Sequence, residues 1–184
     1  MPALARRSLP ALLLAGALAA PRRADAAAQQ EIDADVAAAL VRLRALPQSQ
    51  GLLRQAKAVL VFPRIISGGF IVGGQYGQGA LIRGERTEGY YSIAGVSLGF
   101  LAGAQAAGLA MFFMQEGALA ALRRREGWEV GTGPTVVALD RGLQANATST
   151  TLSEPVYAIT FNQEGLMAAL ALNGTKITRI TPGA

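Results

Sequence analysis

The side chains that most often carry out catalysis are missing or scattered in this sequence. The chain has no Cys and no His, which excludes thiol chemistry, thiolate or imidazole zinc sites and every His-based triad. It contains no Gly-x-Ser-x-Gly or Ser-x-x-Lys string that would mark an activated serine. We therefore expect a protein that is not an enzyme and that uses no cofactor and no metal. A hydrolase whose spread-out carboxylates are paired in space by the fold is the remaining catalytic alternative.

A glycine-rich stretch in the middle of the chain is its most distinctive local feature. The apolar, β-branched run over residues 57–64 predicts a buried strand that ends at Pro63. Residues 68–79 are also strand-like, but side chains are missing at Gly73, Gly74, Gly77 and Gly79, after the Gly68-Gly69 pair that opens the stretch. Glycine inside a strand marks a bulge, a sharp bend or the close approach of another backbone. The stretch is not a phosphate-binding loop, because no G-x-x-x-x-G-K-[ST] string occurs and no helical pattern follows it.

Residues 89–115 contain no charged side chain. An uncharged segment of this length normally predicts a transmembrane helix, and Gly95, Gly99 and Gly103 have the spacing of packed membrane helices. Gly95, Ser97 and Gly99 also alternate with Val96, Leu98 and Phe100, which fits the period of a β-strand. We favour two buried strands joined near Gly103, with a spanning helix and a buried soluble helix as alternatives.

Three short helices are expected around these strands. Apolar residues recur every three or four positions over 31–46, which predicts an amphipathic helix ended by Pro47. It would pack on the core, and a membrane-surface helix is the alternative. A second helix should cover 49–56 with Ser49 as its cap. A third, near 116–125, ends in three arginines that complement its carbonyls or, alternatively, contact anionic lipid.

The remaining chain alternates between strand-forming and turn-forming segments. Turns are expected over 84–89, at Asn162–Gly165 and at Asn173-Gly174, with an exposed polar loop over 144–153. Further strands are expected over 128–131, 135–139, 156–161, 166–172 and 176–180. The fold class is therefore α+β: a curved, mostly antiparallel, barrel-like sheet with short N-terminal helices and one short helix near 116–125.

The first 26 residues have the pattern of a secretory signal peptide. Arg6 and Arg7 precede a short apolar run, and Ala24-Asp25-Ala26 supplies a small-x-small end, after which we expect cleavage. The arginine pair resembles a twin-arginine signal, and ordinary Sec export is the alternative. Of the 17 Lys and Arg and 12 Asp and Glu, four and one lie in this segment, which leaves 13 against 11. A body so weakly basic does not favour nucleic acid as a partner.

From about Leu52 to Ile180 the chain resembles the SYLF domain, in the form found in bacterial exported proteins related to yeast actin-binding SH3 proteins. The resemblance is carried by strings spread over about 130 residues in the family's order. These are Ala56-Lys-Ala-Val-Leu-Val-Phe-Pro63, Gly68-Gly-Phe70 with Gly73-Gly74 and Gly77-Gln-Gly79, Tyr91-Ser92, Gly99-Phe-Leu-Ala-Gly-Ala-Gln105, Gly165-Leu-Met-Ala168 and Leu172-Asn-Gly-Thr-Lys-Ile177.

The resemblance implies a lipid-binding module with no established reaction. Eukaryotic relatives bind phosphoinositides or actin filaments, which an exported bacterial protein is not expected to meet. Family lipid binding is assigned to the N-terminal segment, which implies Arg54, Lys57 and Arg64 by position. Arg83 and Arg86 cluster with them around the central strands, and each cation contributes about 1 kcal/mol at an anionic membrane.

Three segments follow from these expectations: a signal peptide (1–26), an N-terminal helical segment (27–51) and a SYLF-like lipid-binding domain (52–182). The expected location is the periplasm, either free or at a membrane surface, and the expected partner is an anionic phospholipid. The alternative is an envelope structural or assembly protein that binds a protein partner through a sheet edge.

Overall fold

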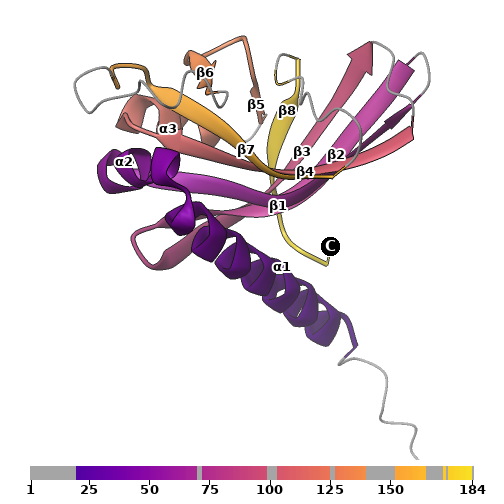
Figure 1. Cartoon of the computed structure of the whole chain (residues 1–184). Coiled ribbons are helices and arrows are strands. Elements are labelled where there is room, and N and C mark those ends of the chain that lie inside the picture. Colours follow the sequence, from indigo (N-terminus) through magenta and orange to yellow (C-terminus); the bar gives the residue numbers. More distant parts are fainter. Residues whose placement is uncertain are drawn as a thin grey trace, which may run out of the picture.

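The computed structural model describes residues 20–69, 72–98, 103–124, 127–139, 152–164, 172 and 174–183 (Figure 1). Its helices are α1 (Ala20–Ala45), α2 (Pro47–Gln55) and α3 (Glu116–Leu122). Its strands are β1 (Ala58–Gly69), β2 (Val72–Arg83), β3 (Arg86–Leu98), β4 (Gly103–Phe113), β5 (Trp128–Glu129), β6 (Val136–Ala138), β7 (Val156–Glu164) and β8 (Lys176–Ile180). The fold is α+β, as the sequence predicts.

The strands form one strongly curved sheet, a half-barrel, in the order β5-β8-β3-β2-β1-β4-β7-β6. Neighbouring strands are antiparallel except β6 and β7, which are parallel. The four longest strands, β1 to β4, lie at its centre, and the two edge strands described are only two and three residues long. This confirms the expected curved, mostly antiparallel sheet.

Strand β1 does not end at Pro63, which corrects the boundary expected from the sequence. The strand continues to Gly69, and its register shifts between Val61 and Arg64 against β2 and between Phe62 and Ile65 against β4. Proline lacks the N–H group that a regular ladder needs, so a bulge is one of the few places where a strand accepts it. Pro63 therefore bends the strand without breaking it.

Glycine on β2 allows this bend. A Cβ atom placed on Gly79 would lie 2.0 Å from the carbonyl oxygen of Val61, and one on Gly77 would lie 2.7 Å from that of Arg64. No residue with a side chain fits at such distances. Of the three features that glycine in a strand can mark, the close approach of another backbone is the one found at these two positions, and it occurs where β1 is bulged.

The uncharged segment forms two strands, β3 and β4, as favoured from the period-2 alternation. Residues 99–102, which join them, lie outside the described residues. In the described part of the chain, no helix combines the length and the hydrophobicity that crossing a bilayer requires.

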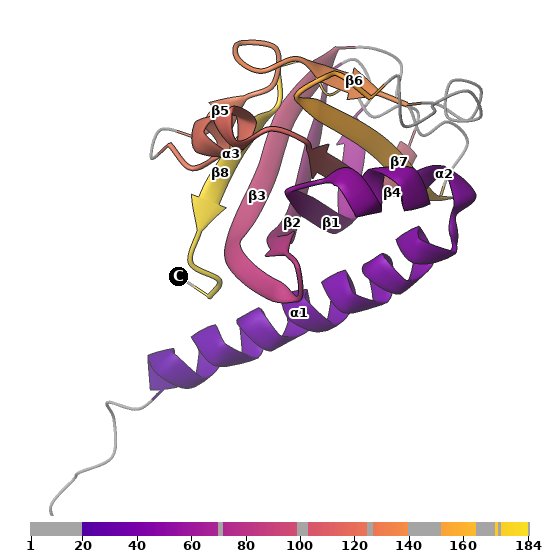
Figure 2. The ribbon, with the colours of Figure 1, turned by 90° about the vertical axis from the view of Figure 1, so that its left-hand side faces the viewer.

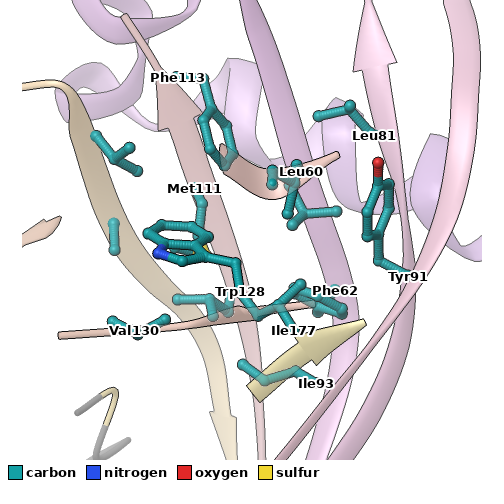
Figure 3. Packing of buried hydrophobic residues seen from close by; sticks show 14 of the residues in the cluster. Leu60, Phe62, Leu81, Tyr91, Ile93, Met111, Phe113, Trp128, Val130 and Ile177 are labelled. Atoms are coloured by element: carbon teal, nitrogen blue, oxygen red, sulfur yellow. The ribbon is translucent and has the colours of Figure 1, made fainter. Parts of the chain in front are cut away.

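Alternate side chains of the strands pack on opposite faces of the sheet. On the concave face, Leu60 and Phe62 of β1 pack with Met111 and Phe113 of β4 (Figure 3). Trp128 closes this core, with its ring 5.9 Å from that of Phe113 in an edge-to-face contact. Helix α3 contributes Ala118, Leu119 and Leu122 to the same cluster.

The convex face is covered by the two N-terminal helices. Helix α1 lies obliquely across it, and α2 turns back toward the start of β1 (Figure 2). The buried stripe of α1 packs on Val59 and Val61 of β1 and on their neighbours; it consists of Ile32, Val36, Ala39 and Leu43. Core packing of the amphipathic helix is therefore what the structure shows.

Two further local predictions are corrected. Ser49 does not cap α2, because that helix begins at Pro47 and the side chain of Ser49 faces the end of α1. Asn162 does not begin a turn: β7 continues to Glu164, and Asn162 has a φ of 49° at a register shift against β4. The predicted loop over 144–153 and the strand over 166–172 fall almost entirely outside the described residues.

Candidate functional site

Four of the five cations expected to bind lipid lie at one end of the sheet. Arg54 is in the last turn of α2, and Lys57 directly precedes β1. Arg83 and Arg86 face each other across the β2–β3 hairpin, and Ile82 pairs with Val59, so the hairpin lies beside Lys57. All four side chains are exposed. We call these four residues the hairpin-end cations.

Arg83 differs from the other three because it is already ion-paired. Its guanidinium lies 2.5 Å from Glu116 and 3.6 Å from Glu88, and Glu88 is also 2.5 Å from Arg123. The hydrogen bond from Arg123 to Glu88 raises the pKa of Arg123. Two carboxylates therefore compensate Arg83 and Arg123. Within the described residues, Arg54, Lys57 and Arg86 have no acidic partner within 4 Å.

Arg64 is not part of this group. It lies seven residues further along β1, which in a strand corresponds to roughly 20 Å. There, at the bulge, it lines a groove of about 400 Å³ between α1 and the convex face of the sheet. The groove is bounded by Ala28, Glu31, Ile32 and Asp35 of α1 and by Pro63, Arg64, Ile66, Tyr76, Gly77 and Gln78 of the strands.

A second hollow lies on the other side of Arg64. It has a volume of about 250 Å³ and is lined by Asp35, Ala38, Arg42, Pro63, Arg64, Ala106, Ala107 and Asn162. The two hollows share Asp35, Pro63 and Arg64, so they form one groove that Arg64 divides; we call it the α1 groove. The bulge at Pro63 and the positive φ of Asn162 both shape its walls.

The α1 groove carries two basic and two acidic side chains. Glu31 lines the first hollow, Arg42 lines the second, and Asp35 and Arg64 line both. None of the four forms an ion pair within 4 Å in the part of the chain that the structure describes. The groove is thus a place where unpaired charges of both signs lie together.

An apolar strip continues from the groove along the convex face. Ile66 pairs with Tyr76 across β1 and β2, and Val96 of β3 lies opposite Gly74, one diagonal step from Tyr76. Their side chains are 54%, 53% and 70% exposed. Large apolar side chains at such exposure, side by side on a sheet, are typical of a surface that contacts another molecule.

The groove residues other than Arg64 were not expected from the sequence as a site. Glu31, Asp35 and Arg42 recur at positions i, i+4 and i+11 of α1, beside its buried stripe, so they share one face. That periodicity is visible in the sequence. The sheet surface facing it is not, because the pairing of β1 with β2 decides which residues lie under the helix.

A catalytic carboxylate pair is not found within the described residues. The polar side chains buried there are Ser49, Gln75 and Thr175, and none is acidic. No group of three or more Asp and Glu residues gathers there in a way that would hold a metal ion. The paired hydrolase carboxylates considered as an alternative would need to be buried beside a cleft, whereas Glu31 and Asp35 are both exposed.

The described residues thus form a curved sheet with an exposed charged end and a mixed-charge groove along α1. Residues 94–181 match the family model Ysc84, described as "Las17-binding protein actin regulator". This part of the chain is accordingly a Ysc84 (SYLF) domain, a family of binding domains. The match extends from the middle of β3 to the end of β8. No curated protein matches the chain.

Proposed function

We propose that this protein is a non-enzymatic lipid-binding domain of the bacterial cell envelope that contacts anionic phospholipid headgroups. The observation that carries the proposal is the exposure, at one end of the sheet, of Arg54, Lys57 and Arg86 without acidic partners. Arg83 lies among them, and Arg64 would contribute from the α1 groove. The lipid-binding function implied by the SYLF resemblance supports the same reading.

Electrostatic attraction of this kind has a defined size. Each basic side chain near an anionic surface contributes about 1 kcal/mol, and the contribution declines within a Debye length of about 8 Å at physiological salt. Three unpaired cations on one end therefore favour reversible attachment to a membrane surface. Attachment should weaken as salt is added.

Co-sedimentation with vesicles tests the proposal. The protein should pellet with vesicles that contain phosphatidylglycerol and much less with pure phosphatidylcholine vesicles. The double variant Arg54→Gln/Arg86→Gln should bind the anionic vesicles about thirtyfold more weakly, since two cations of about 1 kcal/mol each are removed. The matched control is Lys176→Gln on β8, which pairs with Ala94, eight residues along β3 from Arg86. It should bind nearly as the parent protein does, whereas Arg86→Gln alone should bind about fivefold more weakly. Failure to bind either kind of vesicle would contradict the proposal.

The periplasmic location is a separate part of the proposal and depends on export. Residues 1–19 lie outside the described residues, and α1 begins at Ala20 and continues through the expected cleavage position after Ala26. We expect cleavage to shorten α1 at its start and to leave the buried stripe from Ile32 to Leu43 in place. Intact mass of the exported protein tests this, and retention of Met1 would contradict it. Replacing Arg6 and Arg7 by lysine separates twin-arginine export, which should fail, from Sec export, which should continue.

A protein partner is the second candidate. The description of the matched family names binding to a protein, Las17, which favours this reading for the fold. The proposed mode is addition of a partner strand at a sheet edge; the edge strands β5 and β6 offer few backbone groups for it. A pull-down from periplasmic extract would favour a protein partner if capture persisted after lipid was removed by detergent, and would disfavour it if capture was lost.

A further inference from the structure

The α1 groove has a charge arrangement that the hairpin end lacks. At the hairpin end, Arg54, Lys57 and Arg86 outnumber Glu85, the exposed acid of the turn that no ion pair compensates within the described chain, so this end attracts a negatively charged surface. In the groove, two acids and two bases lie around a concave space, and none of them is neutralised by an ion pair within the described chain. Acidic and basic side chains that are not paired with each other can each pair with one end of a ligand that carries both a positive and a negative charge.

The acids and the bases are not mixed at random. Glu31 and Asp35 lie one helical turn apart on α1 and both line the first hollow. Arg42 and Arg64 both line the second hollow, where Asn162 adds a neutral polar group. Asp35 and Arg64 line both hollows, so Glu31 marks the acidic end of the groove, Arg42 marks its basic end, and the two signs meet in between. A ligand bound across the two hollows would place its cationic group toward α1 residues 31 and 35, and its anionic group between Arg42 and Arg64.

The apolar strip gives such a ligand a third contact. Ile66 and Tyr76 line the first hollow and are about half exposed, and Val96 extends the strip away from the helix. Burying such side chains contributes roughly 25 cal/mol for each Å² removed from water. A hydrocarbon chain attached to the charged group would cover this strip.

We propose that the α1 groove binds a single zwitterionic phospholipid molecule, with its phosphodiester at Arg42 and Arg64, its ammonium group at Glu31 and Asp35, and an acyl chain along Ile66, Tyr76 and Val96. The proposal rests on lipid binding as the function proposed above, but it assigns a second site and a different lipid class. The hairpin-end cations attach the protein to an anionic surface, and the groove takes one lipid from it.

The charges of the groove also disfavour ligands that carry a charge of one sign alone. A fatty acid or an anionic phospholipid would satisfy Arg42 and Arg64 but would leave two carboxylates unpaired beside it, at a cost in binding free energy. A simple amine would leave the two arginines unpaired in the same way. Only a ligand with both charges satisfies both pairs of side chains.

Binding of a water-soluble lipid monomer tests the proposal without a membrane. Dihexanoylphosphatidylcholine, used below its micelle concentration, should shift the backbone NMR signals of residues 28–35, 64–66 and 76–78. Asp35→Asn should weaken its binding about threefold to fivefold, as expected for one partly exposed charge pair, and should strengthen the binding of dihexanoylphosphatidylglycerol. Arg64→Gln should weaken both. The controls Glu85→Gln and Arg124→Gln, exposed and outside the groove, should change neither.

The two proposals fail in different ways. Suppose that Arg54→Gln/Arg86→Gln no longer binds vesicles but binds dihexanoylphosphatidylcholine as the parent protein does. This result would support two separate sites, the hairpin end and the α1 groove. Equal effects of Asp35→Asn on the two short-chain lipids would overturn the zwitterion proposal, and so would monomer-induced shifts confined to the hairpin end. If vesicles are not bound but dihexanoylphosphatidylcholine still shifts the groove signals, the headgroup surface is wrong and the groove is correct. A charge-preserving variant, Ile66→Ser, should weaken monomer binding while leaving vesicle attachment intact.

Discussion

The hydroxyl group of Tyr90 donates a hydrogen bond of 2.9 Å to Oδ2 of Asp33, and so links strand β3 to helix α1 across 57 positions of the chain. Thr87 donates to the other oxygen of the same carboxylate, at 3.2 Å. Asp33 is thus held by two residues of one strand. Because α1 forms one wall of the groove, this contact helps to fix the width of the groove at its Glu31–Asp35 side.

We expect Tyr90→Phe to destabilise the protein by about 0.5–1 kcal/mol, because it removes one exposed hydrogen bond and leaves the packing of the ring intact. Thermal unfolding followed by circular dichroism measures this change. Thr87→Val, which removes the longer bond, should have a smaller effect. Equal stability of Tyr90→Phe and the parent protein would show that the contact does not hold α1.

The same contact gives a pH dependence at alkaline pH. Burial of the Tyr90 hydroxyl raises its pKa, and the hydrogen bond and charge of Asp33 raise it further. The folded protein therefore keeps the proton of Tyr90 at pH values where the unfolded chain has begun to lose it. Stability should fall as the pH rises above about 10, the ordinary tyrosine pKa. Part of this loss of stability should be absent in Tyr90→Phe. If the variant and the parent protein lost stability equally with rising pH, Tyr90 would not be the cause.

Gly79→Ala should be among the most destabilising single changes in the sheet. Its Cβ atom would overlap the carbonyl oxygen of Val61, so β1 and β2 would have to separate at the bulge. We expect a loss of more than about 3 kcal/mol, in the range of severe backbone strain. Gly51→Ala is the matched control, because no atom lies within 4 Å of its added methyl group and the residue is inside α2. That change should stabilise the protein by about 0.5–1 kcal/mol.

Ser49→Ala should destabilise the junction between α1 and α2. The Ser49 hydroxyl is buried and lies within hydrogen-bond distance of the carbonyl oxygens of Leu43 and Leu46, where α1 ends. Removing it leaves carbonyl groups at the end of a helix without this partner, which costs about 1–2 kcal/mol. Chemical denaturation measures the change, with Ser153→Ala, an exposed position, as control. A cost no larger than that of the control would show that the hydroxyl is not needed there.

The strands of this fold could be predicted because residue alternation and glycine positions are visible over a few neighbouring residues. The alternation around Val96 and Leu98 favoured strands over a spanning helix, and the glycines at 77 and 79 indicated that another backbone comes close. The strand ends were predicted less well. Pro63 and Asn162 look like ends in the sequence, but both lie at bulges inside strands, since neighbouring strands on each side hold the chain in the sheet.

The two candidate binding surfaces also differ in how well the sequence predicts them. The exposure of Arg54, Lys57 and Arg86 is what isolated charged residues beside turns are expected to show. The α1 groove was not predicted, because it arises where helix α1 crosses the bulge of β1, and the crossing is set by contacts between residues far apart in sequence. The sequence also gives no sign that Arg83 is compensated, because its partner Glu116 is 33 positions away.

Glu88→Gln should strengthen membrane attachment while hardly changing stability. Glu88 bridges Arg83 and Arg123 at the hairpin end, and all three side chains are partly exposed. Exposed ion pairs contribute about 0–1 kcal/mol each, so the loss in unfolding free energy should stay in that range. Neutralising Glu88 leaves both arginines with less compensation beside Arg86, which should raise affinity for phosphatidylglycerol vesicles about threefold to tenfold at low salt.

Glu129→Gln is the control for this change, because it raises the net charge equally but lies on β5, away from the Arg83–Glu88–Arg123 network. It should alter vesicle affinity by less than about twofold, as expected for a charge further than a Debye length from the contact surface. Raising the salt concentration should bring Glu88→Gln back to the affinity of the parent protein. If the two variants gained equally, attachment would follow net charge alone and the hairpin end would not be the contact surface.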